Sequence, residues 1–299
     1  AAKYDTSDSV YGNIPSTEIP DPTPVPPPVW PDGIQPLSPG FGGNHGWTKE
    51  YVDKGGLAYT DVFSENLWSS RYEPTMELKA LSVADGKKRD FWDHGTGGAS
   101  GTFYRHAPVT QSHYEPAVGT AVNAIDCRAA GVEKMFYYWV IKGKEQIVPG
   151  HRNISFYEYD GTFMPFAIVY GMIGQYLYQY EPVEPLELAD NLTTFLFRKK
   201  SDGTPLLAAY ATLRGFAESE RHQVRDCGMG CLVSDPRGVY VRLDAWLRED
   251  QACVRDVMLN PTRDGIEAKG GKLSLWVGEE PVFIEGCGVS VTAFRDALK

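Results

Sequence analysis

Two kinds of hydrophobic pattern follow one another along the chain. Up to about residue 180, short apolar runs typical of buried strands alternate with stretches in which apolar residues recur at helical spacing. Alternation of strands and helices predicts parallel β/α units. The expected strands are 57–64, 89–93 and 133–141, and the expected helices are 74–84, 113–130 and 165–180.

The pattern changes after Glu181. Short strand-like runs are now separated by turn signals such as Ser201-Asp202-Gly203 and Asn260-Pro261, which is typical of an antiparallel β-sandwich. The expected strands are 191–198, 205–213, 238–245, 252–259, 272–277 and 281–285. We therefore predict a fold that is α/β plus all-β, with a β/α domain over residues 46–182 and a β-sandwich over residues 187–299.

Residues 1–45 carry no such periodicity and are rich in proline, which favours extended conformations without backbone donors. We interpret this segment as an arm or linker that lies across a surface, and a disordered tail is the alternative. The start of the chain lacks the charged and then apolar pattern of a secretion signal. A mature, processed or truncated start is therefore expected.

Composition narrows the range of partners. The chain has 299 residues, of which 42% are hydrophobic, and a formal net charge of −10. An acidic protein is a poor partner for nucleic acid or for an anionic membrane surface, so neither is expected. No apolar run approaches the ~20 residues that span a bilayer.

Cysteine spacing gives no sign of a metal site. Five cysteines leave at least one unpaired, and Cys227 and Cys231 can form a short local disulfide but lack zinc or redox spacing. We expect no metal and no other cofactor. Two glycosylation triplets, at Asn153 and Asn191, fit an extracellular or secreted protein if the source is a eukaryote.

Six stretches resemble conserved segments of one enzyme class. Residues 59–68, 91–98 and 129–138 are similar to the sixth, seventh and eighth strands of a β/α barrel, and residues 159–170 to the opening of its last helix. Residues 254–261 and 280–286 are similar to the final strands of the appended β-sandwich. Over residues 47–286 the chain thus resembles the C-terminal part of a retaining, clan A-like glycoside hydrolase. The resemblance implies a partial (β/α)8 TIM-type barrel, of about strands 6–8, followed by the β-sandwich.

The chain departs from this class at the positions that carry its chemistry. The seventh strand of the family reads Trp-Asp-Thr-Glu-Thr-Gly-like, and its nucleophilic glutamate aligns here with Gly95. The fourth-strand Asn-Glu that supplies the acid/base has no counterpart. The sixth-strand histidine is also absent, and its position falls near Glu65 or Asn66. Glycine at position 95 is explained by natural decay of the site, by engineering, or by a register that is off by a residue or two.

Two carboxylates remain as catalytic candidates. Retaining hydrolysis uses two such groups roughly 5 Å apart, at the C-terminal ends of barrel strands. Asp93 and Glu65 lie at predicted strand ends. Side chains alternate along a strand, so we expect Asp93 to point away from the position of the missing glutamate, and a turn or capping role is its alternative. A solvated or salt-bridged side chain is the alternative for Glu65.

Aromatic residues near the same strand ends are candidates for substrate binding, because rings pack against the apolar faces of sugars. Alternate residues of 136–139 must serve ordinary packing, so only about half of these rings are expected to line a cleft. His94 is a candidate donor to a sugar hydroxyl, or a structural histidine at a turn. The aromatic candidates are Trp68, Tyr72, Trp92, Tyr104, Tyr137, Tyr138 and Trp139.

Two functions fit these observations. The first is a glycoside hydrolase-like part that acts on or binds carbohydrate and needs a partner segment for the missing barrel half and the acid/base glutamate. The second is a pseudoenzyme with a structural, assembly or glycan-binding role. Three β/α units expose both sheet edges, so a second protein chain or self-association into an oligomer is expected in either case. The isolated chain is expected to be inactive.

Overall fold

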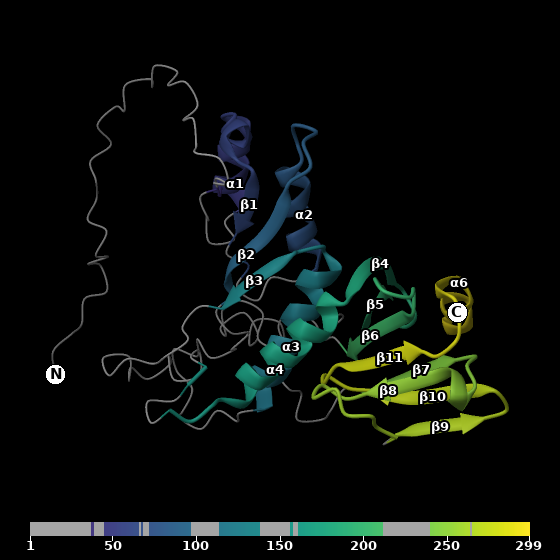
Figure 1. Cartoon of the computed structure of the whole chain (residues 1–299). Coiled ribbons are helices and arrows are strands. Elements are labelled where there is room, and N and C mark those ends of the chain that lie inside the picture. The colour runs from purple at the N-terminus through teal and green to yellow at the C-terminus, as the bar shows by residue number, and fades with distance from the viewer. Residues whose placement is uncertain are drawn as a thin grey trace, which may run out of the picture. The chain divides into compact units, whose positions relative to one another are not determined.

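The computed structural model describes residues 37–38, 45–65, 67, 72–96, 114–137, 156–157, 161–211, 240–263 and 265–299. The chain divides into two units, residues 1–35 and residues 36–299. The first unit lies outside the described residues, so the following description concerns the second. Figure 1 shows its elements in chain order.

The first half of this unit contains a three-stranded parallel sheet of order β1-β2-β3, formed by β1 (Val62–Glu65), β2 (Asp90–Thr96) and β3 (Lys134–Tyr137). Helices α2 (Tyr72–Ser82) and α3 (Tyr114–Ala129) join successive strands, and α4 (Pro165–Tyr178) follows β3. The parallel pairing predicted from the alternating pattern is confirmed. Helix α1 (His45–Asp53) precedes the sheet and was not predicted.

The second half contains two antiparallel sheets. The five-stranded sheet has the order β4 (Tyr180–Leu186), β5 (Leu192–Lys199), β6 (Pro205–Ala211), β11 (Val282–Gly286) and β8 (Ala252–Arg255). The three-stranded sheet has the order β7 (Val241–Ala245), β10 (Lys272–Val277) and β9 (Ile266–Lys269). Helix α6 (Val291–Leu298) ends the chain, and Ser290 caps it by accepting a hydrogen bond from the Ala293 amide at 3.2 Å.

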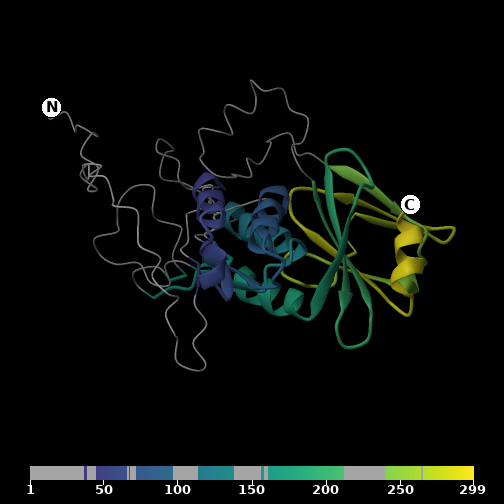
Figure 2. The same ribbon diagram turned by 90° about the horizontal axis from the view of Figure 1, so that it is seen from above.

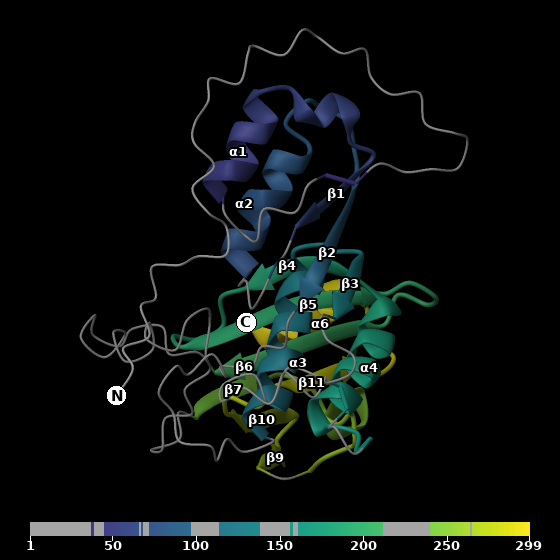
Figure 3. The ribbon, with the colours of Figure 1, turned by 90° about the vertical axis from the view of Figure 1, so that its left-hand side faces the viewer.

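The five-stranded sheet is the middle of three layers. On one face, alternate β-strand residues such as Phe195 and Phe197 share a buried cluster with Val118 of α3 and Val169 of α4. On the other face, residues such as Leu196 share a second cluster with the three-stranded antiparallel sheet and α6. Figure 2 and Figure 3 show the helices on one side of this sheet and the second sheet on the other. Because successive side chains of a strand point to opposite faces, this one sheet contributes to two hydrophobic cores, one on each face.

Three differences from the sequence prediction have a clear local description. Residues 57–64 begin not as a strand but as a 3-10 helix, Gly56–Tyr59, because Gly55 adopts a φ of 81° and turns the chain. Tyr180 does not end a helix but begins β4, where it pairs with Lys199. The strand expected over 252–259 ends at Arg255, where the Leu259 amide donates to the Asp256 carbonyl and closes a turn. Strands β4 and β9 and helix α6 were not predicted.

In the described residues, no helix is long and apolar enough to cross a membrane. No group of three or more His, Cys, Asp or Glu side chains in the same ranges is arranged to hold a metal ion. Cys127, Cys253 and Cys287 are free thiols. The Cys227–Cys231 disulfide suggested by the sequence lies outside the described residues.

A buried arginine holds the first β/α unit together. The Arg89 side chain is only 1% exposed. Its Nε donates to the Thr60 carbonyl at 2.8 Å and its Nη2 to the Leu57 carbonyl at 2.7 Å. Both terminal nitrogens also pair with the Asp85 carboxylate at 2.6 Å. Arg89 therefore satisfies backbone carbonyls of the turn before β1 and fixes the loop that follows α2.

The Arg89–Asp85 pair predicts a dependence of stability on pH. The hydrogen bond from Arg89 holds the pKa of Asp85 well below its ordinary value. A carboxyl group whose pKa is lower in the folded than in the unfolded protein stabilises the folded state at any pH above its unfolded-state pKa. This stabilisation is lost as the pH falls towards the folded-state pKa. We expect the free energy of unfolding to differ most between wild type and Asp85→Asn above about pH 5, and the difference to shrink towards about pH 2. Urea unfolding of both proteins across this range measures it, and a difference independent of pH would contradict the assignment.

Candidate functional site

The parallel sheet has two chemically distinct faces. On the first, Phe63 of β1 pairs in register with Phe91 of β2, with ring centroids 5.9 Å apart. These rings share a buried cluster with Leu78 of α2 and Cys127 of α3, so this face is covered by helices. The opposite face carries Ser64, Trp92, His94, Lys134 and Phe136, and we call it the Trp92 face.

The two catalytic candidates lie on the helix-covered face. Glu65 and Asp93 are register partners in neighbouring strands, and both are fully buried. Thr48 Oγ1 of α1 donates to Glu65 Oε1 at 2.7 Å, and the Leu67 amide donates to Asp93 Oδ1 at 3.1 Å. Each carboxylate thus has a structural partner. Their catalytic role stays a prediction, and they do not belong to the Trp92 face.

Two titratable side chains near Asp93, Tyr170 and Cys127, have pKa values shifted by burial and by the Asp93 charge. Burial, with the Asp93 charge as the next contribution, raises the pKa of Tyr170 to about 12. The same two effects raise the pKa of the Cys127 thiol well above its ordinary value. The Tyr170 hydroxyl donates to the Met135 carbonyl at 2.6 Å. Asp93 is therefore enclosed by side chains of α3 and α4 that stay protonated at neutral pH.

The Trp92 face combines rings, a cation and hydrogen-bonding groups. The rings of Trp92 and Phe136 lie 5.8 Å apart, and Lys134 Nζ stands 3.9 Å from the Trp92 ring centroid. Phe136 is 47% exposed. Ser64 Oγ and His94 Nδ1 share a hydrogen bond of 2.9 Å. Within the described part of the chain, Trp92 Nε1 has no hydrogen-bond partner.

Partial burial lowers the pKa of His94. Its imidazole is therefore neutral at pH 7, with one nitrogen bound to Ser64 and one able to donate to or accept from a ligand. The neutral histidine and the ammonium group together offer both donor and acceptor groups beside an aromatic surface. That arrangement suits a polyhydroxylated ligand with apolar C–H faces.

One edge of the sheet is covered over a short length. Leu37 forms a parallel bridge with Val62, and the Ser38 amide donates to the Val62 carbonyl at 3.0 Å. Ser38 Oγ accepts from the Ser64 amide at 2.7 Å and donates to the Ser64 carbonyl at 2.9 Å. These two residues, predicted to belong to the arm, thus satisfy backbone groups of β1 next to the Trp92 face.

The remaining sequence candidates separate into three groups. Tyr137 packs against Phe156, with centroids 4.2 Å apart, and against Phe166 in a cluster on the helix-covered side. Tyr72 contacts the Phe195 ring at 5.0 Å, beside the five-stranded sheet. Among the candidates in the described ranges, only Trp92 and His94 lie together on the Trp92 face. Trp68, Tyr104, Tyr138 and Trp139 lie outside the described residues.

Position 95 lies at an irregular point of β2. Asp93 pairs with Met135 and Thr96 with Tyr137, so three steps along β2 oppose two along β3. This irregularity breaks the simple alternation of side chains between residues 93 and 96. The alignment of Gly95 with the nucleophile of the enzyme class that the sequence resembles stays a prediction.

Comparison with solved structures finds several chains with a related fold, one of which is a glycoside hydrolase. No family model matches the chain, and no curated protein sequence does. The glycoside hydrolase belongs to family 39 and comes from the gut symbiont Bacteroides cellulosilyticus WH2, with a TM-score of 0.58 and 15% sequence identity. The match covers 83% of this chain and 49% of that one, so this chain spans about half the length of the solved structure. The likeness supports a glycoside hydrolase-like, mixed α/β fold.

Proposed function

We propose that this chain is a glycoside hydrolase-like part that binds carbohydrate on its Trp92 face. The observation that carries the proposal is the grouping of Trp92, Phe136 and Lys134 on the sheet face opposite the one on which α2 and α3 pack, where Phe136 is exposed and Trp92 half-buried. A sugar ring packs its C–H face on exposed aromatic rings, while its hydroxyls bond to nearby polar groups. Likeness to a family 39 glycoside hydrolase favours carbohydrate over other polar ligands.

The same likeness supports a finer arrangement. In it, β1, β2 and β3 are strands 6–8 of a TIM-type barrel over residues 46–182, and the two antiparallel sheets form the β-sandwich over residues 187–299. The Trp92 face is then the inner face of the barrel, since helices cover the outside of such barrels. The solved structure is about twice as long as the matched region. The remaining barrel half, with the acid/base glutamate, is supplied by another segment or a second protein chain.

The alternative is a catalytically inactive relative with a glycan-binding, structural or assembly role, acting through self-association. The buried, hydrogen-bonded state of Glu65 and Asp93 favours this alternative for the chain on its own. The glycan-binding form of the alternative uses the same Trp92 face, and both functions fit a secreted protein. The two functions differ in whether the chain, joined to the missing barrel half, hydrolyses glycosides. Assays of the native assembly with a panel of aryl glycosides measure this.

Replacement of Trp92 by alanine is the direct test of the binding surface. We expect Trp92→Ala to weaken oligosaccharide binding about tenfold or more, because the loss of one aromatic contact of roughly 1–1.5 kcal/mol corresponds to about that factor. Isothermal titration with oligosaccharides selected on a glycan array measures the effect.

A matched control is present in the other half of the molecule. Trp246 is 64% exposed and carries Lys272 Nζ 5.4 Å from its ring centroid, so it offers the same pairing of ring and cation away from the parallel sheet. Trp246→Ala should leave the affinity unchanged. Equal weakening by both replacements would count against the Trp92 face.

A further inference from the structure

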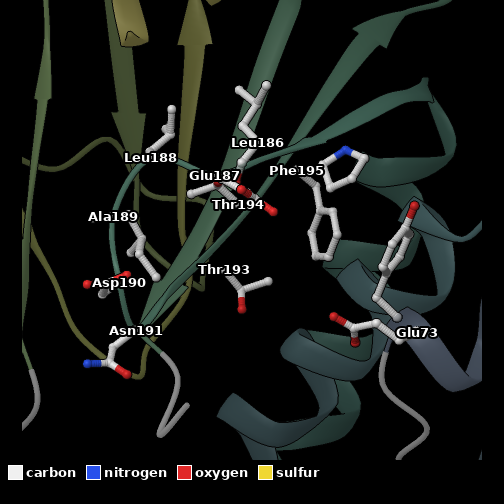
Figure 4. Close-up of a pocket in the computed structure, with 13 residues that line it drawn as sticks. Glu73, Leu186, Glu187, Leu188, Ala189, Asp190, Asn191, Thr193, Thr194 and Phe195 are labelled. Atoms are coloured by element: carbon white, nitrogen blue, oxygen red, sulfur yellow. The ribbon is translucent and has the colours of Figure 1, made fainter. Parts of the chain in front are cut away.

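A second potential binding site lies apart from the Trp92 face. It is a groove of about 860 Å³ between the start of α2 and the segment that joins β4 to β5, lined by Tyr72, Glu73 and residues 185–195. None of the five residues of the Trp92 face lines it. Figure 4 shows Thr193 in the middle of this groove, between Glu73 and the turn that carries Asp190 and Asn191.

Thr193 is a buried polar residue whose hydroxyl is unused. The residue is 7% exposed, and its Oγ1 has no hydrogen-bond partner among the described residues. Its neighbour Thr194, on the opposite face of β5, donates to the Leu186 carbonyl at 2.5 Å. A buried hydroxyl without a partner costs free energy, which a bound ligand can recover by supplying the missing hydrogen bond.

Among the described residues that line the groove, the charged side chains are all acidic. Glu73, Glu187 and Asp190 line the groove and are exposed at its surface, while no lysine, arginine or histidine is among the lining residues. A groove lined by carboxylates raises the local concentration of cations and repels anions. The Tyr72 ring, packed on Phe195, adds an aromatic surface beside the carboxylates.

We propose that this groove binds a cationic amino sugar, that is, a glucosamine-type unit with a free ammonium group. The carboxylates accept from the ammonium group, the Thr193 hydroxyl bonds a sugar hydroxyl, and the C–H face of the ring packs on Tyr72. The choice of a sugar over another amine rests on the proposed carbohydrate function. The groove volume is within the usual range for a small-molecule site, about 300–1,000 Å³.

Titration calorimetry with two oligosaccharides of equal length tests the charge. The probes are a fully de-N-acetylated glucosamine tetramer and the tetra-N-acetylated tetramer, in a buffer that keeps the amine protonated. We expect the charged tetramer to bind at least about tenfold more tightly, and its affinity to fall as salt rises, because salt screens exposed charges. Equal affinity for both tetramers, or no binding of the charged one, would overturn the proposal.

Two neighbouring threonines supply a matched pair of variants. Thr193→Val should weaken binding of the charged tetramer about fivefold to tenfold without lowering the thermal unfolding midpoint, since the lost hydroxyl had no partner in the fold. Thr194→Val should lower the midpoint, because its hydroxyl is bonded to Leu186, and leave the affinity unchanged. Asp190→Asn should weaken binding while the fold is retained. An unchanged affinity in Thr193→Val would overturn the proposal.

The Trp92→Ala variant separates this site from the proposed function. The affinity for the glucosamine tetramer should be unchanged in Trp92→Ala and about fivefold to tenfold lower in Thr193→Val. If Trp92→Ala abolishes tetramer binding, the tetramer occupies the Trp92 face and the groove proposal is wrong, while carbohydrate binding by the chain stands. If the tetramer binds through Thr193 but no glycan depends on Trp92, the groove stands and the proposed function fails.

Discussion

Replacement of Arg89 by methionine is expected to lower the free energy of unfolding by about 3–5 kcal/mol. Methionine keeps much of the volume of the side chain but has no donors. The Thr60 and Ser82 carbonyls, which accept from Arg89 at 2.8 and 3.1 Å, would lose this donor, and the Leu57 carbonyl would keep its bond from the Thr60 amide at 3.1 Å. Buried carbonyls left without donors are among the costliest defects in a fold. Urea unfolding followed by circular dichroism measures the change.

Arg198 is the control for this prediction. It pairs with Glu181 on the surface and its side chain is 54% exposed. Exposed pairs contribute little, so Arg198→Met should cost less than about 1 kcal/mol. A loss of that small size for Arg89→Met as well would show that the turn before β1 does not depend on the buried guanidinium.

Replacement of Asp93 by alanine is expected to lower the free energy of unfolding by about 2–3 kcal/mol, because the buried Leu67 amide loses its acceptor. Asp93→Asn should cost less, since an amide oxygen can still accept from that amide. Because the Asp93 charge contributes to the raised pKa of Tyr170, both variants should also lower that pKa from about 12 towards its ordinary value. Equilibrium unfolding and a spectroscopic tyrosine titration measure the two effects.

The same variants separate the structural and catalytic interpretations of Asp93. On the structural interpretation, Asp93→Asn keeps carbohydrate binding on the Trp92 face, because the carboxylate points to the other side of the sheet. Glu65→Gln should behave in the same way. A native assembly that hydrolyses aryl glycosides and loses this activity in Asp93→Asn, at unchanged stability, would instead establish the catalytic role.

Secondary structure was predictable where one periodicity dominated. The strand expected over 272–277 is β10, residue for residue, because its buried positions are flanked by clear turns. Strand β4 was missed because it carries Pro182 and Pro185, which argue against a strand in a local reading. It lies at the edge of its sheet, where proline is tolerated. Edge position is a property of the whole sheet, so local sequence does not reveal it.

The site was only partly predictable, for a related reason. Trp92 and His94 stand out in a local motif, but Ser64, Lys134 and Phe136 join them only through the register between strands. The expectation that alternate residues of 136–139 serve packing holds for the described pair, since Phe136 is exposed and Tyr137 is packed among rings. We expected Asp93 to point away from the side chain at position 95, but strict alternation would place residues 93 and 95 on the same face. The irregular pairing between residues 93 and 96 means that alternation does not decide how these two side chains point.

The central claim is that carbohydrate binds on the Trp92 face, and the indole N–H resonances of the protein test it most directly. The chain has seven tryptophans, and comparison of the wild type with Trp92→Ala assigns the resonance of Trp92. On titration with an oligosaccharide that the protein binds, the Trp92 resonance should shift in proportion to occupancy, while those of Trp246 and Trp276 stay in place. Saturable binding without a shift of the Trp92 resonance would contradict the account.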